Sequence, residues 1–264
     1  MKIRLHQFLS KCGVFSSKSE VKNAIWDGKI TVNGSTVKNI SFEFNPNKKV
    51  IMYQNEELHL PTENIYFLLN KPSGYICSRL NSHEKELGKK SVYEILRESV
   101  KSTAYESLIT VGRLDQETTG FLIVTTDGKL VHKITSPDNN VKKTYYVKTT
   151  KSITEKQIKI IRNGVKITVN DHGITQEYTT RPAEISDITE YTLKITIDEG
   201  KKREIRRIFS TLGNEVTVLH RLSTENMELS NYKLEIGDYC KITIQEIEEF
   251  IFGKSIPHKK GEKN

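Results

Sequence analysis

The chain has 264 residues, of which 36% are hydrophobic and 28% charged, and its formal net charge is +8 at pH 7. This length can bury a core and suits one large domain with a small one, while the positive charge makes polyanions the first partners to consider. Three widely spaced cysteines argue against a structural zinc, and the lack of a long apolar run or a signal peptide leads us to expect a soluble, cytoplasmic protein away from membranes.

The first 40 residues predict a small helical unit with a positive charge. Its first helix is expected at about residues 5–12, where apolar side chains recur at helical spacing before Gly13. A second helix is expected from about Ser17, with Glu20 as the other half of a capping box. Seven Lys or Arg against two acidic residues in this segment indicate contact with phosphate groups. The lysines that we expect to bind RNA are Lys11, Lys18, Lys22 and Lys29.

A strand and a hairpin complete this unit. Residues 29–32 are typical of a strand, and Asn33-Gly34 is a strong signal for a two-residue hairpin. Two helices and a hairpin form too small a core to be firmly stable alone, so we expect an appended module. Polar and proline residues at 43–62, with one short strand at 49–53, place the domain boundary there. We therefore expect one domain and its linker at residues 1–60, a second domain at 61–253 and a basic tail at 254–264.

From residue 65 onward the pattern predicts mainly strands, with helices at irregular intervals. Strands are expected within 65–75, at 121–124, at 144–150 and at 191–198, the last because apolar and polar residues alternate there. Helices are expected around 130–134, from Ser152 with Glu155 as its capping partner, and at 205–212. Strands and helices in no regular alternation predict an α+β fold.

Three stretches place charged or polar side chains beside apolar strands. The first holds Arg113 and Asp115 just before the apolar run 121–124, and the second holds Tyr145 at the start of a strand. The third is EGKKREIRRIF at residues 199–209. If the apolar residues of that helix mark its buried side, Arg206 lies on the flank, where a guanidinium can be half-covered, and Arg207 points to solvent. An arginine beside Asp115 would hold that carboxylate ionised and oriented.

Each of these features also has a purely structural explanation. An Asp in a turn is more often an Asx-turn or a helix cap than a catalyst, and Tyr145 alone fits a packed strand residue. A basic run is usually a solvated face or a phosphate-binding patch. The chain lacks a dinucleotide-binding glycine loop, a Walker A lysine, an HExxH motif and a GxSxG motif. Composition and spacing thus indicate an RNA-binding α+β protein and leave open whether it is an enzyme.

Four ordered motifs resemble those of the pseudouridine synthases of the RsuA/RluB type, which act on ribosomal RNA. GRLDQETTGFLIVTTDG at 112–128 resembles the signature that carries the family's catalytic Asp, here Asp115. YFLLNKPSGYICS at 66–78 resembles the opening strand, with its Lys-Pro-x-Gly at 71–74. KKTYYV at 142–147 and EGKKREIRRIFSTLGNEV at 199–216 resemble the other two motifs. Residues 3–38 are similar to an S4 RNA-binding module, so the resemblance covers most of the chain.

The resemblance implies a fold and a set of roles. We expect an S4-like domain joined to a catalytic domain whose mixed, mostly antiparallel sheet has flanking helices. Asp115 would be the catalytic residue, Arg113 would fill the space left by a flipped-out uridine, and Tyr145 would stack against its base. Arg206 would pair with Asp115. No metal or other cofactor is implied, and the expected partner of this monomer is ribosomal RNA or a ribosomal subunit assembly intermediate.

The implied reaction isomerises one uridine of ribosomal RNA to pseudouridine. Segment 132–147 looks most like the enzyme for small-subunit (16S) RNA, but the large-subunit (23S) enzymes share every catalytic motif and stay an alternative. A non-catalytic S4-type RNA-binding assembly factor is a further alternative, against which the retained Asp115, Tyr145 and Arg206 argue. The chain departs from the family at Glu204, where Gln is usual, at 220–229, which lacks the usual Arg-Ile-Gly, and at 16–20, where paired arginines are frequent.

Overall fold

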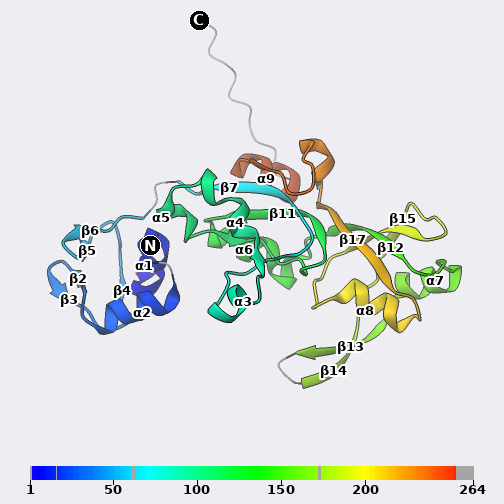
Figure 1. Cartoon of the computed structure of the whole chain (residues 1–264), viewed down its shortest axis with the longest axis horizontal. Coiled ribbons are helices and arrows are strands. Elements are labelled where there is room, and N and C mark those ends of the chain that lie inside the picture. The colour runs from blue at the N-terminus through cyan, green and yellow to red at the C-terminus, as the bar shows by residue number, and fades with distance from the viewer. Residues whose placement is uncertain (1, 16, 61–62, 172–173, 254–264) are drawn as a thin grey trace, which may run out of the picture. The chain divides into compact units, whose positions relative to one another are not determined.

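The computed structural model describes residues 2–15, 17–60, 63–171 and 174–253 (Figure 1). The basic tail expected at 254–264 lies outside these residues. The chain forms two compact units. The N-terminal unit contains Met1–Ile65, Val92–Ile109 and Thr125–Gly128, and the C-terminal unit contains Tyr66–Ser91, Thr110–Val124 and the chain from Lys129 onward. Two later segments of the chain thus belong to the N-terminal unit. These units are defined by contacts, and the division of the chain at residue 60 stays a prediction.

Two helices and short strands build the N-terminal unit. Helix α1 (Leu5–Cys12) buries the predicted apolar stripe and ends at Gly13, whose φ of 70° is left-handed. Helix α2 (Lys18–Trp26) begins as predicted, because the Ser17 side chain accepts a hydrogen bond from the Glu20 backbone N–H at 3.1 Å. One strand pair joins β1 (Ile3–Arg4) to β4 (Glu43–Phe44). A four-stranded sheet has the order β3 (Ser35–Thr36), β2 (Ile30–Val32), β5 (Ile51–Tyr53), β6 (Glu56–Glu57).

The predicted Asn33-Gly34 turn is confirmed. Strands β2 and β3 pair antiparallel with Val32 opposite Ser35, so the two turn residues are all that connects them. Both have positive φ, 49° for Asn33 and 80° for Gly34, which is the conformation that a tight hairpin needs. The sequence signal therefore described the backbone of this turn correctly.

One long sheet forms the body of the C-terminal unit (Figure 1). In order its strands are β15 (Glu184–Ser186), β16 (Thr192–Ile197), β12 (Lys143–Thr149), β17 (Val216–Thr224), β11 (Thr119–Thr125), β7 (Tyr66–Lys71) and β19 (Tyr239–Lys241). Strands β10 (Ile109–Thr110) and β18 (Met227–Glu228) pair with β11 and β17. The β11–β17 pair is parallel, while the pairs of β12 with β16 and β17, of β15 with β16 and of β19 with β7 are antiparallel. The expected mixed, mostly antiparallel sheet of an α+β protein is confirmed.

Helices cover this sheet through apolar side chains. Helices α6 (Gly128–Thr135) and α9 (Ile244–Phe252) share one buried cluster with strands β7 and β11. Its most buried members include Leu68, Phe121, Ile123, Ile134 and Ile247. The remaining helices of at least eight residues in this unit are α7 (Glu155–Asn163) and α8 (Glu204–Thr211).

The predicted start of α7 is wrong by two residues. Thr154, not Ser152, caps this helix, and its side chain forms a capping box with Gln157. The backbone N–H of Ile153, just before the cap, donates to the Glu190 carbonyl at 2.7 Å. The helix begins at Glu155, directly after this cap.

Shorter elements fill the connections. They are β8 (Tyr75–Ile76), β9 (Lys90–Ser91), α3 (Ser82–Glu86), α4 (Val92–Ile95), α5 (Ser102–Tyr105) and three 3-10 turns at Arg97–Ser99, Pro137–Asn139 and Leu229–Tyr232. The hairpin of β13 (Lys166–Asp171) and β14 (Ile174–Thr179) forms a separate two-stranded sheet next to α8 (Figure 1). It carries Tyr178 toward the loop that precedes α8.

Candidate active site

Asp115 lies in the loop that leads into β11. Its backbone carbonyl accepts a hydrogen bond from the Thr118 N–H at 3.1 Å, which closes a tight turn. The strand that follows is buried from Gly120 to Thr125, whereas 30% of the Asp115 side chain is exposed. The sequence predicted this carboxylate just before a buried strand, and in the structure Asp115 lies four residues before β11.

Lys71, at the end of β7, anchors this loop. The side chain is fully buried, and its three ammonium hydrogens are shared among four backbone carbonyls, those of Pro72 at 3.0 Å, Asp115 at 3.2 Å, Gln116 at 3.2 Å and Thr118 at 2.8 Å from Nζ. Burial lowers the pKa of Lys71 below its usual value. Four carbonyls around one buried ammonium fix the backbone on both sides of Asp115. In the sequence Lys71 stood out only as part of a motif, and nothing there pointed to this role.

Arg203 is the cation beside Asp115. Its Nη1 lies 3.9 Å from Asp115 Oδ2 and donates a hydrogen bond to Glu117 Oε2 at 3.2 Å. Arg203 is the N-cap of α8 and has a left-handed φ of 55°. The backbone N–H of Glu117 and the Arg203 side chain hold the pKa of the Glu117 carboxyl below its usual value. One guanidinium therefore bridges two carboxylates at the rim of the site.

The predicted pairing of Arg206 with Asp115 is not what the described residues show. Arg206 is half-buried on α8, and its Nη1 donates to the backbone carbonyl of Val216 at 2.9 Å. That bond turns the guanidinium toward the start of β17, and no ion pair with Asp115 occurs in the described part of the chain. Burial, and then the charge of Arg203, lower the pKa of Arg206. Arg207, expected in solvent, is also half-buried.

Tyr145 and Arg113 share a pocket with Asp115. The pocket has a volume of about 650 Å³, and its lining includes all three side chains. Tyr145 belongs to the inner strand β12, is 8% exposed, and has a pKa raised by burial. Arg113 is exposed, two residues before Asp115. The structure thus brings three of the four predicted site residues to one pocket and leaves Arg206 outside its lining.

Basic residues form part of the pocket wall. Lys201, Lys202 and Arg203 come from the turn before α8, and all three are exposed. A half-exposed carboxylate, an aromatic ring and several cations suit a ligand that carries a planar ring and phosphate groups. The carboxylate can act on such a ligand as a nucleophile or a base. Within the described residues, no three His, Cys, Asp or Glu side chains gather into a metal-binding group.

The N-terminal unit has exposed basic residues of its own. The four predicted RNA-binding lysines, Lys11, Lys18, Lys22 and Lys29, are all exposed. Lys29 is held by Asp27 at 2.9 Å. The sequence-based prediction did not include Trp26, which is 54% exposed and lies one helical turn after Lys22 on α2. An exposed indole at helical spacing from two lysines was the signal that could have found it.

The chain resembles known proteins over nearly its whole length. A family model described as RNA pseudouridylate synthase matches residues 65–211, and a model of the S4 domain matches residues 3–50. Ribosomal small subunit pseudouridine synthase A of Haemophilus influenzae is 30% identical over 94% of this chain and 100% of the relative. The protein of that name from Escherichia coli K12 is 31% identical over 93% of this chain and 98% of the relative. A crystal structure of a pseudouridylate synthase aligns with a TM-score of 0.63 and 30% identity, covering 94% of this chain and 100% of that one.

The helices are short or amphipathic throughout the described ranges. None of them combines the length and the apolar character that a crossing of the lipid bilayer requires.

Proposed function

The chain belongs to the RNA pseudouridylate synthase family and carries an S4 domain, and from this premise we propose that it isomerises a uridine of small-subunit (16S) ribosomal RNA to pseudouridine. Relatives named ribosomal small subunit pseudouridine synthase A support this choice of RNA. Asp115 is proposed as the catalytic group. The observation that carries the proposal is the pocket in which Asp115 meets Tyr145 and Arg113.

The isomerisation requires of the protein one carboxylate and a pocket that holds the uridine. The bond between C1′ of the ribose and N1 of uracil breaks, the ring turns, and a bond forms between C1′ and C5. The proton on C5 is lost and N1 gains one, so no atom or electron is added overall. Asp115 acts at the sugar–base unit as a nucleophile or a base, on the loop that Lys71 fixes.

The target uridine must leave its stack to reach Asp115, because a duplex or stacked strand shields the glycosidic bond. In this proposal Tyr145 supports the flipped base by stacking and Arg113, which is exposed, fills the space left behind. Lys201, Lys202 and Arg203 contact phosphates around the target. Lys11, Lys18, Lys22 and Lys29 bind RNA from the N-terminal unit.

We propose further that the protein acts in the cytoplasm as a monomer, on free ribosomal RNA or on subunit assembly intermediates. The exposed lysines of α1 and α2 support direct RNA contact. The division into residues 1–60 and 61–253 belongs to the same proposal, with the first part serving to bind RNA.

The test is tritium release from 16S and 23S RNA labelled at uridine C5, run beside the Asp115→Asn variant. We expect release from 16S RNA only, its loss in the variant, and RNA affinity within about twofold of wild type. Release from 23S RNA alone would keep the enzyme and replace the substrate. No release from either RNA, nor from partly assembled subunits, would favour the RNA-binding assembly factor. A collapse of binding in Asp115→Asn would make that residue structural.

A further inference from the structure

A second pocket adjoins the one that contains Asp115. Its volume is about 390 Å³, which is within the range of small-ligand sites. Arg113, Tyr145 and Lys201 line both pockets, so the two share part of their wall. All residues of the second pocket belong to the C-terminal unit. The proposed reaction places the target uridine in the first pocket and assigns no occupant to the second.

Strands β12 and β17 bring two cations to the second pocket. Lys143 is the first residue of β12, and Arg221 belongs to β17. Tyr145 lies directly opposite Arg221 in this antiparallel pair, two residues after Lys143. The register of the pair shifts between Thr144 and Tyr145, yet Lys143, Tyr145 and Arg221 all line the second pocket.

Arg221 is a buried cation that the protein uses only in part. The residue is 4% exposed, and its guanidinium carbon lies 5.8 Å from the centre of the Phe121 ring. Its Nε donates to the backbone carbonyl of Phe121 at 2.5 Å. This bond occupies one of the five N–H donors of the side chain, and the other four are on the two terminal nitrogens. A guanidinium presents such donors as a fork that fits two oxygens of a phosphate group.

Lys143 is the second cation, and it is half-buried. Its Nζ donates to the backbone carbonyl of Val141 at 2.8 Å. Over the ranges that the structure describes, neither Lys143 nor Arg221 forms an ion pair with a carboxylate. Burial first, and then the charge of Arg221, lower the pKa of Lys143. Two covered cations without a counter-charge are costly for a protein, and an anionic ligand would remove that cost.

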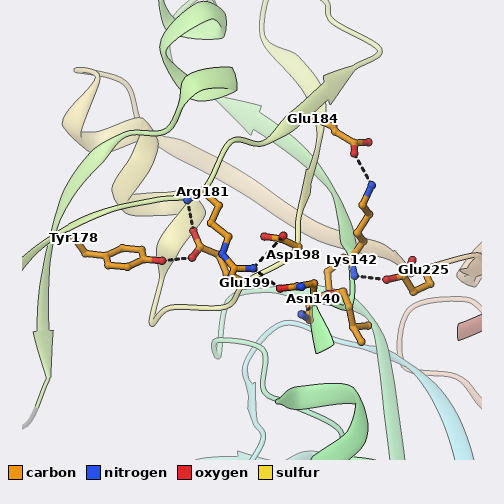
Figure 2. Close-up of polar contacts among 10 residues, drawn as sticks. Asn140, Lys142, Tyr178, Arg181, Glu184, Asp198, Glu199 and Glu225 are labelled. Carbon is orange, nitrogen blue, oxygen red and sulfur yellow. Dashed lines mark hydrogen bonds and ion pairs between the residues drawn. The ribbon is translucent and has the colours of Figure 1, made fainter. Parts of the chain in front are cut away.

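The acidic residues of the second pocket have partners of their own. Glu199 accepts hydrogen bonds from the Tyr178 hydroxyl and, at 2.8 Å, from the Arg181 backbone N–H (Figure 2). Asp198 Oδ2 pairs with the Arg181 side chain at 3.2 Å, and Asp198 Oδ1 is fully covered, so it faces no ligand. Five basic residues and these two acidic ones line the pocket. The pocket therefore keeps a positive charge that no side chain on its wall neutralises.

A phosphate group of RNA suits this arrangement. It can accept two hydrogen bonds from the Arg221 fork and a third from the Lys143 ammonium. An RNA strand carries a phosphate on each side of every nucleoside. With a uridine beside Asp115, one of its two neighbouring phosphates is the anion closest to the wall that the pockets share.

We propose that Lys143 and Arg221 form a phosphate-binding subsite in the second pocket, and that this subsite holds a phosphate next to the target uridine. It would anchor the strand on one side of the flipped nucleotide. The identity of the phosphate rests on the proposed function. The binding of RNA through the subsite does not, because it requires no turnover.

The first experiment measures RNA affinity of the full-length protein against salt concentration. Lys143→Gln should weaken binding about tenfold and reduce the slope of log affinity against log salt by about 0.7–0.9, because one phosphate contact is lost. Lys143→Arg keeps the charge and should restore most of both. Lys142→Gln is the matched control, because the adjacent Lys142 is exposed, pairs with Glu184 at 2.6 Å and lies outside the pocket lining (Figure 2). Equal changes in Lys142→Gln and Lys143→Gln would overturn the subsite.

Arg221 calls for a conservative change, because a shorter neutral side chain would also lose the bond to the Phe121 carbonyl. Arg221→Lys keeps the charge and removes the fork, so we expect a loss of RNA affinity smaller than that of Lys143→Gln, with thermal unfolding as the check on the fold. If both side chains hold one phosphate, the double variant should lose less affinity than the two single losses combined. Fully additive losses would show that the two cations act at separate places.

The second experiment changes the RNA. Once tritium release has located the target uridine, one uncharged methylphosphonate linkage is placed on either side of it. At one of the two linkages the change should weaken binding to wild type about tenfold and hardly affect Lys143→Gln, because the partner of that phosphate is already gone. Equal losses for the two proteins at both linkages would contradict the assignment of this phosphate.

Inorganic phosphate separates the RNA backbone from a free anion as the ligand. Calorimetry on the RNA-free protein measures its binding to wild type and to Lys143→Gln. If Lys143→Gln loses phosphate binding and keeps its RNA affinity and salt slope, the pocket serves a free anion and the RNA subsite is refuted. No turnover from wild type on any RNA would overturn the proposed function alone, since the salt slopes of Lys142→Gln and Lys143→Gln would still decide the subsite.

Discussion

The ammonium nitrogen of Lys71 lies 3.2 Å from the backbone carbonyl oxygen of Asp115. This contact is made to the main chain and not to the carboxylate, so Lys71 fixes the backbone of Asp115 and leaves its carboxylate without a hydrogen bond from Lys71. Arg203 contacts the side chain instead. Backbone position and side-chain orientation of Asp115 are thus controlled from two different parts of the chain.

Replacement of Lys71 by Met should damage both stability and turnover. The change leaves four backbone carbonyls around an apolar side chain, which should cost about 2–4 kcal/mol of unfolding free energy. A displaced loop should lower kcat about a hundredfold with a smaller change in KM. Thermal unfolding and steady-state kinetics measure these effects. A variant with normal kcat and reduced stability would show that Lys71 is structural only.

Replacement of Arg203 by Gln should lower kcat/KM about tenfold or more while hardly changing stability. The ion pairs of Arg203 are exposed and worth about 0–1 kcal/mol each, but the guanidinium orients Asp115. Arg206→Ala should instead cost about 1–2 kcal/mol of stability, because its bond to the Val216 carbonyl is half-buried. The reverse result would be an Arg203→Gln variant with normal kcat/KM and an Arg206→Ala variant that is stable but inactive. It would support the pairing of Arg206 with Asp115 that was expected from the sequence.

Gly120 should not tolerate a side chain. A Cβ there would lie 2.2 Å from the Arg221 carbonyl oxygen, at a φ of 105°. Gly120→Ala should therefore lower the unfolding free energy by more than about 3 kcal/mol, from strain and steric overlap together. Gly213 is the matched control, because its φ is 73° and no described atom outside its neighbours would lie within 4 Å of an added Cβ. Gly213→Ala should cost only about 1–2 kcal/mol, and equal losses in urea unfolding would refute the close-packing argument.

Trp26 should contribute to RNA binding through its exposed indole. Trp26→Ala should weaken RNA binding about tenfold and Trp26→Phe much less, because an aromatic face still stacks on a base. The chain contains a single Trp, so intrinsic fluorescence reports on α2 alone and should be quenched by RNA. Lys22→Ala should reduce the slope of log affinity against log salt by about 1. Unchanged fluorescence at saturating RNA would place the bound RNA elsewhere.

Stability should fall between pH 4.5 and about 8 because of Glu204. Burial raises its folded-state pKa to about 8, above the ordinary value of 4.5, so in this window the folded protein retains a proton that the unfolded chain releases. This stabilisation is complete below pH 4.5 and is lost as pH rises through the folded-state pKa. The Tm of Glu204→Gln relative to wild type should therefore increase up to about pH 8 and then level off. Glu184→Gln should follow wild type, and a constant Tm difference for Glu204→Gln would contradict the raised pKa.

Much of the fold could be predicted because its signals are local. The apolar stripe of α1, the Ser17 cap and the Asn33-Gly34 turn depend on residues within a few positions of each other. The start of α7 could not, since Ser152 and Thr154 both offer a capping pattern in sequence. The structure shows that Thr154 is the cap and that Gln157 completes its capping box.

The candidate site also combines residues that local motifs predicted with contacts that only the fold determines. Asp115, Arg113 and Tyr145 were identified from motifs, and the structure gathers them in one pocket. The choice between Arg203 and Arg206 depends on a left-handed N-cap and on the carbonyl of Val216, which helical periodicity does not describe. The burial of the Glu204 carboxyl was equally hidden, because helical spacing does not show that the first residue of α8 is only 3% exposed.

The parallel pairing of β11 with β17 also sets a time at which the surroundings of the Asp115 loop can be completed. Thr119 lies opposite His220 and its hydroxyl contacts the His220 ring at 2.8 Å, across 101 residues of sequence. At a synthesis rate of about 5–20 residues per second, β17 is made roughly 5–20 seconds after the Asp115 loop. A chain still attached to its ribosome therefore carries the carboxylate long before it has the strand that supports it. The pocket around Asp115, whose lining includes Leu219 of β17, is therefore complete only after that strand has been made.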